Sequence, residues 1–355
     1  MSGTSLDGVD AVLVDFQSGA KVLSFVSTPF PESLRTTLLR LNQSSANELH
    51  VAALAANELA RLYAASVANL LKQTNIHASN VRAIGCHGQT IRHRPDLCFT
   101  IQIQNPALLA ELASIAVVAD FRSRDIAAGG HGAPLVPVFH DSVFRHAAHD
   151  RVVVNIGGIC NITVLLRGQT AWGFDCGPGN ILLDAWTQQC LGRPFDVDGS
   201  WATSGNVIAA LLKTMQSEPY FSAAPPKSTG RDLFNLKWLE EKNAGENYRA
   251  EDIQATLLEL TARTLANDIT RHAPLCVEVF LCGGGAHNAA LRARLGQLLS
   301  GITIHKTDDL GIAAQQVEAV AFAWFAQQAV NGVALDLTRI TGARHPNILG
   351  AVYPA

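Results

Sequence analysis

Asp175 is the residue whose place in the sequence best suits it to act as a general base. It ends a short apolar run, 172–175, that is typical of a strand, and the glycine-rich segment 177–180 predicts the turn that opens a helix over 181–191. The N–H groups and the dipole of a helix N-terminus favour an ionised carboxylate, which can take a proton from water or from a hydroxyl group. The alternative is a structural aspartate that caps the helix or stabilises a turn.

Glycine-rich turns at the ends of predicted strands point to phosphate binding. Four occur, at residues 3–8, 157–158, 177–180 and 283–285. Glycine lets backbone N–H groups approach a phosphate closely, and ligands of open α/β sheets bind where such turns gather. One such turn is as consistent with an ordinary tight turn, but four together favour a nucleotide. The motif GxxxxGK[ST] is absent and residues 283–288 fail GxGxxG at the last position, so hairpin turns are expected to hold the phosphates.

Three further carboxylates could serve such a site. Asp7 and Asp10 lie beside the first glycine turn, where they could hold Mg²⁺ through water, because hard cations prefer oxygen ligands. Asp7 could equally cap the turn, and Asp10 could be an ordinary strand-edge residue. Glu318 stands in an apolar helix, 315–330, and is either a buried functional acid or part of the polar stripe of that helix.

A polar cluster after another predicted strand could contact a sugar. His87 follows the strand 81–85 and precedes Gln89 and Thr90, although a lone histidine is more often structural. Basic side chains could bind a carboxylate or a phosphate, unless they are solvated surface charges. They are Arg92, Arg94, Arg122 and Arg124, with Lys227 and Arg231 in a loop rich in Ser, Thr and Gly.

Alternating strands and helices must position these residues. Apolar patterns predict strands over 9–16, 81–85, 100–103, 115–119 and 277–281, a hairpin of 151–156 with 161–166, and helices over 46–74, 107–113, 253–271 and 288–300. This order is typical of an α/β protein with a largely parallel sheet. A glycine turn that feeds an apolar strand occurs near residue 3 and again near residue 157, which hints at two related halves around a cleft.

Composition excludes several other classes of protein. The chain has 355 residues, of which 48% are hydrophobic and 16% charged, so it can bury the cores of about two domains and is not disordered. Its net charge of −3 does not suit a nucleic-acid binder that is held by phosphate contacts. Seven dispersed cysteines without a CxxC pair fit buried thiols in a reducing cytosol. No signal peptide or membrane-spanning run is recognisable, so we expect a cytoplasmic protein without membrane or nucleic-acid partners.

Several motifs together resemble the anhydro-N-acetylmuramic acid kinase family, almost from end to end of the chain. The most specific are SGTSLDGVD at 2–10, HGQTIRH at 87–93 and FDCGPGN at 174–180. Others occur at 105–111, 118–122, 132–137, 227–231 and 282–286.

The resemblance implies a fold and an activity. The fold is the α/β, two-domain actin-like (ribonuclease H-like) ATPase fold with an interdomain active-site cleft; we expect one domain over 1–119 plus 340–355 and the other over 120–339. The reaction converts 1,6-anhydro-N-acetylmuramate, ATP and water into N-acetylmuramate 6-phosphate and ADP, in bacterial cell-wall recycling. ATP and Mg²⁺ are the implied cofactors, and a homodimer is implied by the resemblance alone. The alternatives are an ordinary kinase of a free hexose and a non-catalytic sugar- or nucleotide-binding relative.

The resemblance also assigns residues to roles. Asp175 is the catalytic base, and Glu318 is a second acid of the site. The ATP-binding stretch is Gly3, Thr4, Ser5, Leu6, Asp7, Gly8, Val9 and Asp10, which we extend to the turns at Gly157, Gly158, Gly283, Gly284 and Gly285, with Asp7 and Asp10 as Mg²⁺ ligands. The expected sugar contacts are His87, Gln89, Thr90, Asn105, Asp120 and Arg122.

Three departures from the family pattern bear on these roles. The sequence starts at the SGTSLDG loop, where family members usually have a preceding strand, so either the sequence is truncated there or the first hairpin lacks a strand. Gln104 stands where glycine is usual and could tighten a turn on the sugar side. His131 stands where glutamine is common, an exchange that could alter substrate contacts without changing the reaction class.

Overall fold

The protein is described by a computed structural model that covers residues 1–3, 6–243 and 245–355. The chain divides into two compact units, the first made of Met1–Phe139 with Gln316–Ala355 and the second of His140–Gln315. The first unit therefore continues past residue 119, and it takes up α12 (Val317–Val330) besides the C-terminal tail. The reason is close packing, because a Cβ atom on Gly85 would collide with the backbone carbonyl of Phe322 in α12.

The second unit is built on a five-stranded sheet of order β11-β10-β7-β8-β9. Its strands are β7 (Arg151–Ile156), β8 (Ile159–Leu165), β9 (Trp172–Pro178), β10 (Glu278–Cys282) and β11 (Thr303–Lys306). β7, β8 and β9 pair antiparallel, whereas β10 runs parallel to both β7 and β11. This is the arrangement of a ribonuclease H-like sheet. The predicted hairpin is confirmed, but the expectation of a largely parallel sheet is wrong here, because a two-residue turn joins β7 to β8 and a short loop of residues 166–171 joins β8 to β9.

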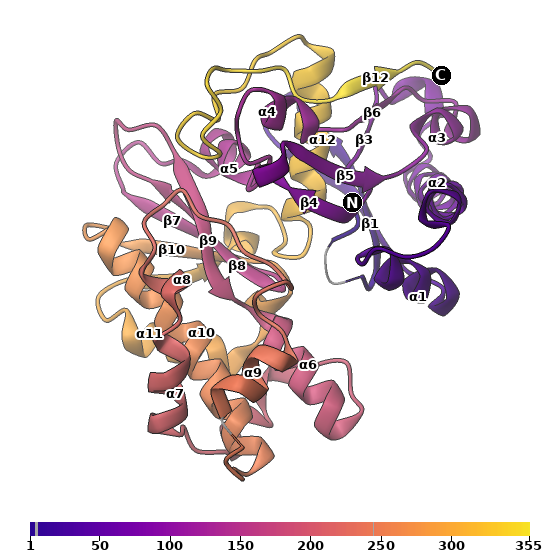
Figure 1. The fold of residues 1–355 in the computed structure, drawn as a ribbon. Helices are drawn as coiled ribbons and strands as arrows, with labels where there is room; N and C mark the ends of the chain where they lie inside the picture. The colour runs from indigo at the N-terminus through magenta and orange to yellow at the C-terminus, as the bar shows by residue number, and fades with distance from the viewer. Residues whose placement is uncertain (4–5, 244) are drawn as a thin grey trace. The chain divides into compact units, whose positions relative to one another are not determined.

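Helices cover this sheet, and the long helix α10 (Ala250–His272) packs against β8 and β9 (Figure 1). α11 (Ala289–Leu298) packs on α10 and β11. Both helices were predicted to within a few residues from their apolar spacing. The remaining helices are α6 (Asn180–Leu191), α7 (Ala209–Gln216), α8 (Pro219–Ser222) and α9 (Leu236–Asn243).

The first unit carries smaller sheets around an apolar core. Its strands are β1 (Gly8–Asp15) with β2 (Lys21–Pro29), β4 (Gln89–Arg94) with β5 (Phe99–Ile103), and β3 (Ile84–Cys86), β6 (Val117–Ala119) and β12 (Ala351–Tyr353) in one sheet. Its helices besides α12 are α1 (Glu32–Leu41), α2 (Glu48–Thr74), α3 (Pro106–Ala113) and α4 (Ser123–Ala127), and α5 (Val136–Phe144) includes the junction with the second unit in the sequence. Leu38, Leu41 and Leu59 of α1 and α2 are fully buried in this core. The C-terminal strand β12 pairs with β6, which joins the two sequence segments of the unit.

Candidate active site

Two glycine turns lie next to each other at one edge of the sheet of the second unit. Gly157-Gly158 joins β7 to β8, and residues 283–285 follow β10. β7 and β10 are parallel neighbours, and Cys282, the last residue of β10, pairs with Asn155, the residue before the last of β7. Gly283 has φ +78°, and a Cβ atom there would collide with Asn155 Oδ1. Only glycine therefore fits at this position. Both turns lie at the carboxyl ends of parallel strands, which is where α/β sheets bind ligands.

The start of α6 is tied to the first of these turns. The backbone N–H of Gly179 donates to the Gly158 carbonyl at 2.8 Å, and that of Asn180 donates to the Gly157 carbonyl at 2.9 Å. A Cβ atom on Gly179 would collide with the Gly157 carbonyl oxygen. The Asn180 side chain also donates to the Ile156 carbonyl at 3.3 Å. The turn therefore has a fixed shape, and the positive end of the α6 dipole lies beside it.

Asp175 lies within β9, opposite Asn161 of β8, and is half-buried. Residues of the segment 220–229 form three hydrogen bonds with Asp175. Tyr220 Oη donates to the Asp175 carbonyl at 2.7 Å, the Asp175 N–H donates to the Lys227 carbonyl at 3.2 Å, and the Thr229 N–H donates to Asp175 Oδ2 at 3.1 Å. The N-cap of α6 is Gly179, so Asp175 does not cap that helix. The Thr229 N–H is thus an observed donor to the carboxylate from outside α6.

Asp175 is also close to the glycine turns along the sheet. Pro178, three residues further along β9, pairs with Ile159, which directly follows Gly158. Three residues of a strand span about 10 Å. A carboxylate and two glycine turns therefore share one edge of the sheet.

The loop before β1 is the corresponding glycine-rich turn of the first unit. Thr4 and Ser5, two predicted ATP contacts, lie outside the described residues. A Cβ atom on Gly8 would collide with the Thr28 carbonyl, and the Phe30 N–H donates to the Asp7 carbonyl at 3.0 Å. Val9 is buried in the core beneath the loop. The turn therefore has little backbone freedom at Gly8.

Leu6 and Gly3 complete the described part of this loop. Leu6 is buried with φ +58°, and the Gln89 side-chain amide donates to the Gly3 carbonyl at 3.1 Å. The predicted sugar contact Gln89 thus supports the loop of the predicted nucleotide site.

Asp7 and Asp10 provide a donor set that fits Mg²⁺. Asp7 is exposed and Asp10 is half-buried. Burial raises the pKa of Asp10, a hydrogen bond from Ser27 opposes this shift, and the negative charge of Asp7 adds to it. Two neighbouring carboxylates that repel each other in this way suit a hard divalent cation. The part of the chain that the structure describes holds no cluster of three His, Cys, Asp or Glu ligands.

Glu318 lies in the first turn of α12 and is partly buried. The pKa of the Met1 amino group lies below its ordinary value because the group is buried. Nearby acidic groups, Glu318 among them, partly oppose this shift. A carboxylate at a helix N-terminus is stabilised by the helix dipole. Glu318 and Met1 belong to the same unit, and Glu318 lies close enough to the Met1 amino group to influence its charge.

His87 and Arg122 contact each other inside the first unit. The Arg122 Nε–H donates to His87 Nε2 at 3.0 Å, and Arg122 Nη1 donates to the Gly132 carbonyl at 2.6 Å. His87 Nδ1 therefore carries the proton and donates to the Gly88 carbonyl at 2.8 Å. Burial, followed by the Arg122 charge, lowers the pKa of His87 well below its ordinary value. His87 is thus a neutral, buried histidine whose two ring nitrogens bind protein groups.

The other predicted sugar contacts have distinct local roles. Thr90 accepts a hydrogen bond from Gln102 at 3.1 Å. Asn105 caps α3 by accepting the Leu108 N–H at 3.0 Å, a role that the Asn-Pro pair at a helix start could have indicated. Asp120 is exposed, with φ +56°.

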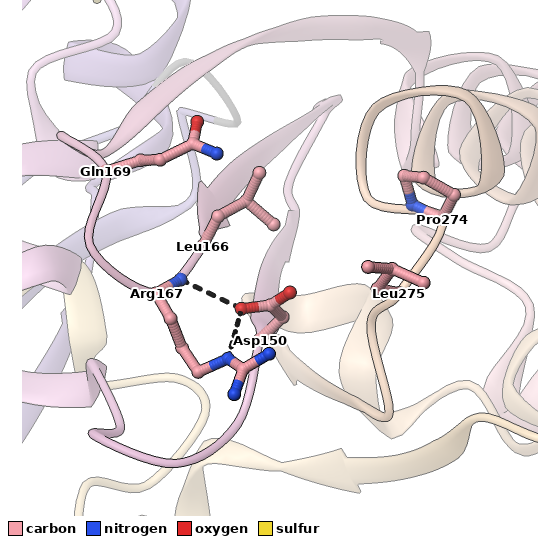
Figure 2. A pocket seen from close by; sticks show the side chains of 6 residues that line it. All are labelled: Asp150, Leu166, Arg167, Gln169, Pro274 and Leu275. Carbon is pink, nitrogen blue, oxygen red and sulfur yellow. Dashed lines mark hydrogen bonds and ion pairs between the residues drawn. The ribbon is translucent and has the colours of Figure 1, made fainter.

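A surface pocket of about 350 Å³ lies elsewhere in the second unit. Figure 2 shows that Asp150 accepts hydrogen bonds from the N–H and Nε of Arg167 at its wall, beside Leu166 and Leu275. Asp150 directly precedes β7, whereas the glycine turn follows the end of β7. The six residues of β7 separate the two by about 20 Å, so this pocket is not part of the candidate active site.

None of the helices that the structure describes combines the length and the apolarity needed to span a membrane.

Comparisons with known proteins point to one family. A family model described as anhydro-N-acetylmuramic acid kinase matches residues 1–355. A protein of that name from Cupriavidus pinatubonensis is 54% identical, over 100% of this chain and 97% of the relative. Its namesake from Nitrosomonas europaea is 51% identical, over 100% of this chain and 98% of the relative. A solved ROK family glucokinase from Streptomyces griseus, in complex with glucose and AMPPNP, is 12% identical over 89% of this chain and 95% of that one, with a TM-score of 0.39.

Proposed function

This chain belongs to the anhydro-N-acetylmuramic acid kinase family, and from that membership we propose that it opens the anhydro ring of 1,6-anhydro-N-acetylmuramate with water and phosphorylates O6 at the expense of ATP. The products are N-acetylmuramate 6-phosphate and ADP, which places the enzyme in cell-wall recycling. ATP is held by the glycine turns and the sugar lies beside Asp175.

One observation supports this proposal above the others. In the second unit the Gly157-Gly158 turn, the Gly283–Gly285 turn and the Asp175 carboxylate share one edge of the sheet. The Gly157-Gly158 turn lies about 10 Å from Asp175 along the sheet, a separation that suits a base acting on a sugar next to the γ-phosphate. The carboxylate accepts the Thr229 N–H, which favours its ionised, basic form.

Asp175 starts the reaction by taking a proton from a water molecule. The water oxygen forms a bond to the anomeric carbon, and the bond from that carbon to O6 breaks. O6 then forms a bond to the γ-phosphorus while the bond between that phosphorus and the β–γ bridging oxygen breaks, and ADP leaves. The protein's task is mainly positioning and charge neutralisation, as in other phosphoryl transfers.

Asp7 and Asp10 would hold Mg²⁺, which neutralises phosphate charge when it is bound. The loop of residues 3–10 contributes backbone N–H groups to ATP. Glu318, which lies close enough to the Met1 amino group to influence its charge, is the second acid of the site and orients the sugar or water. The family resemblance further supports a homodimer and a cytoplasmic location.

The decisive test is turnover of 1,6-anhydro-N-acetylmuramate with Mg·ATP in ¹⁸O-water. We expect ADP release, phosphate on O6 and ¹⁸O at the anomeric carbon, measured by mass spectrometry of the sugar. N-acetylmuramate is the control substrate, and its phosphorylation without turnover of the anhydro sugar would instead identify an ordinary sugar kinase. Inactivity on both sugars, with ATP still bound, would contradict the proposal and favour a binding protein.

Replacement of the base should stop both the opening of the anhydro ring and the phosphorylation of O6. We expect Asp175→Asn to lower kcat about 10³-fold or more, because general bases contribute 10²–10⁴-fold and ring opening precedes phosphorylation here. The matched control is Asp336→Asn, an exposed aspartate of the first unit, which should keep kcat within twofold. An Asp175→Asn protein that still incorporates ¹⁸O at the wild-type rate would show that another group is the base.

A further inference from the structure

Lys227 is a buried cation that the proposed reaction does not use. Its residue is 8% exposed, although lysine almost never leaves water without a partner. The sequence left two alternatives for Lys227, a ligand-binding cation or a solvated surface charge. In the structure its ammonium group instead lies among protein groups of the second unit. It therefore needs a structural or functional explanation.

The Lys227 ammonium group joins β9 to the segment 220–229. Nζ lies 5.3 Å from the centroid of the Phe174 ring in β9 and 4.9 Å from that of the Tyr220 ring. It also donates to the Tyr220 carbonyl at 3.3 Å. A desolvated cation is attracted by the negative faces of two aromatic rings, so this contact holds the two elements together.

The opposite charge comes from α10. Asp268 is 4% exposed, burial raises the pKa of its carboxyl group, and the Lys227 charge opposes that rise. The thiol of Cys176, the residue after Asp175, forms a hydrogen bond with Asp268. The cation and the buried carboxylate thus lie on the inner side of β9, directly behind the proposed base.

The segment that Lys227 fixes is the one that holds Asp175. The carbonyl of Lys227 accepts the Asp175 N–H, Tyr220 Oη donates to the Asp175 carbonyl, and the Thr229 N–H donates to the carboxylate itself. If the segment shifts, the carboxylate loses the donor that favours its charged form. A shift of about 1 Å in a catalytic group can lower a rate about 10²-fold.

We propose that Lys227 is a positioning residue for the base Asp175: its ammonium group, held between Phe174 and Tyr220, fixes the segment that directs the Thr229 N–H at the Asp175 carboxylate. This inference rests on the proposed function, because it assumes that Asp175 is the base. Lys227 acts through Asp175 and does not touch ATP or the sugar.

The test compares two variants. Lys227→Met keeps most of the length of the side chain and loses the charge, whereas Lys227→Arg keeps a positive charge over both rings. We expect Lys227→Met to lower kcat about 10–100-fold with KM for ATP within twofold. The acidic limb of its pH profile, measured as kcat/KM against pH, should move to higher pH, because the carboxylate has lost a hydrogen-bond donor that stabilises its charged form. Lys227→Arg should recover kcat to within about fivefold. Lys213→Met, on the exposed surface of α7, is the matched control and should match the wild type.

A merely structural role predicts a different pattern. It would lower the thermal midpoint and the fraction of active sites, but the kcat per active site and the acidic limb would stay at wild-type values, and that result would overturn the inference. If Lys227→Met does not fold, Lys227→Gln takes its place, since it removes the charge and keeps a polar group near the Tyr220 carbonyl. We expect it to shift the acidic limb in the same direction with a loss of kcat, and an unmoved limb would overturn the inference.

Asp175→Asn, assayed in parallel, separates this inference from the proposed function. Full activity in Asp175→Asn would overturn both, because Asp175 would not be the base. An inactive Asp175→Asn together with a wild-type Lys227→Met would overturn only the role of Lys227.

Discussion

Gly283 shows how one residue type can be required for backbone reasons alone. Its positive φ and the carbonyl and amide oxygens around it leave no room for a side chain. Gly296, in contrast, lies on the exposed side of α11 with nothing near its missing Cβ. The two glycines make a matched pair, because the same substitution has opposite expected effects.

We expect Gly283→Ala to lower the free energy of unfolding by about 2–4 kcal/mol, from left-handed strain and collision with Asn155, and to raise KM for ATP. Gly296→Ala should raise the free energy of unfolding by about 0.5–1 kcal/mol, since alanine is the better helix residue. Urea unfolding and ATP kinetics measure both. A Gly283→Ala protein as stable as the wild type would show that the turn adapts.

His140 makes stability depend on pH. It is fully buried, its Nδ1 lies 2.8 Å from Thr163 Oγ1, and burial lowers its pKa from 6.5 to about 3. His140 therefore binds a proton below about pH 6.5 in the unfolded chain, but only below about pH 3 in the folded protein. The free energy of unfolding should fall as the pH falls through this window, by up to about 1.4 kcal/mol per pH unit for this group.

We expect His140→Gln, which can still bond to Thr163, to show a smaller loss of stability than the wild type between pH 7 and pH 5. Chemical denaturation at the two pH values measures the difference, and the exposed His345 provides the control, His345→Gln. His87, whose pKa is also lowered by burial, should supply part of the slope that remains. Equal slopes in His140→Gln and the wild type would exclude His140 as a source.

At the scale of elements, an ion-pair cluster joins α10 to α11. Glu259 of α10 accepts Arg263 Nε at 2.5 Å and Arg294 Nε of α11 at 2.6 Å. The Glu259 side chain is 5% exposed, and hydrogen bonds from Arg294 first, and then Arg263, lower its pKa. A buried carboxylate that neutralises two arginines is costly to replace, whereas an exposed pair is not.

We expect Glu259→Gln to lower the free energy of unfolding by about 2 kcal/mol, because two partly buried arginines lose their counter-charge. Glu241→Gln on α9 is the control: its carboxylate is 63% exposed and 3.9 Å from Lys237, so the change should stay below about 0.5 kcal/mol. Urea midpoints of the two variants check this. Equal values would mean that the Glu259 cluster contributes nothing to the joint between the helices.

At the scale of the whole molecule, the chain builds one unit from two separate segments and inserts the other unit between them. The pairing of β12 with β6 and the packing of α12 on β3 close the first unit with C-terminal residues. This arrangement makes the order of the sequence a poor guide to domain boundaries.

The proposed homodimer is a prediction at the same scale. Light scattering after size-exclusion chromatography should give a mass of twice the 37.9 kDa of one chain. The value should not change with ATP or sugar. A mass of one chain at micromolar concentration would contradict the homodimer and would leave the proposed reaction untouched.

The sequence by itself determined the α/β class, the long helices α2 and α10, the β7–β8 hairpin and the candidate base Asp175, since apolar periodicity and glycine turns are local signals. It predicted the antiparallel β7–β8 hairpin but not that β9 would run antiparallel to β8, because strand direction depends on how the chain returns. Only the tertiary structure decided that Asp175 takes a hydrogen bond from Thr229, 54 residues away, and that Lys227 is buried between two rings. These contacts join residues distant in sequence, or depend on which face of an element is buried, and neither is written in local spacing.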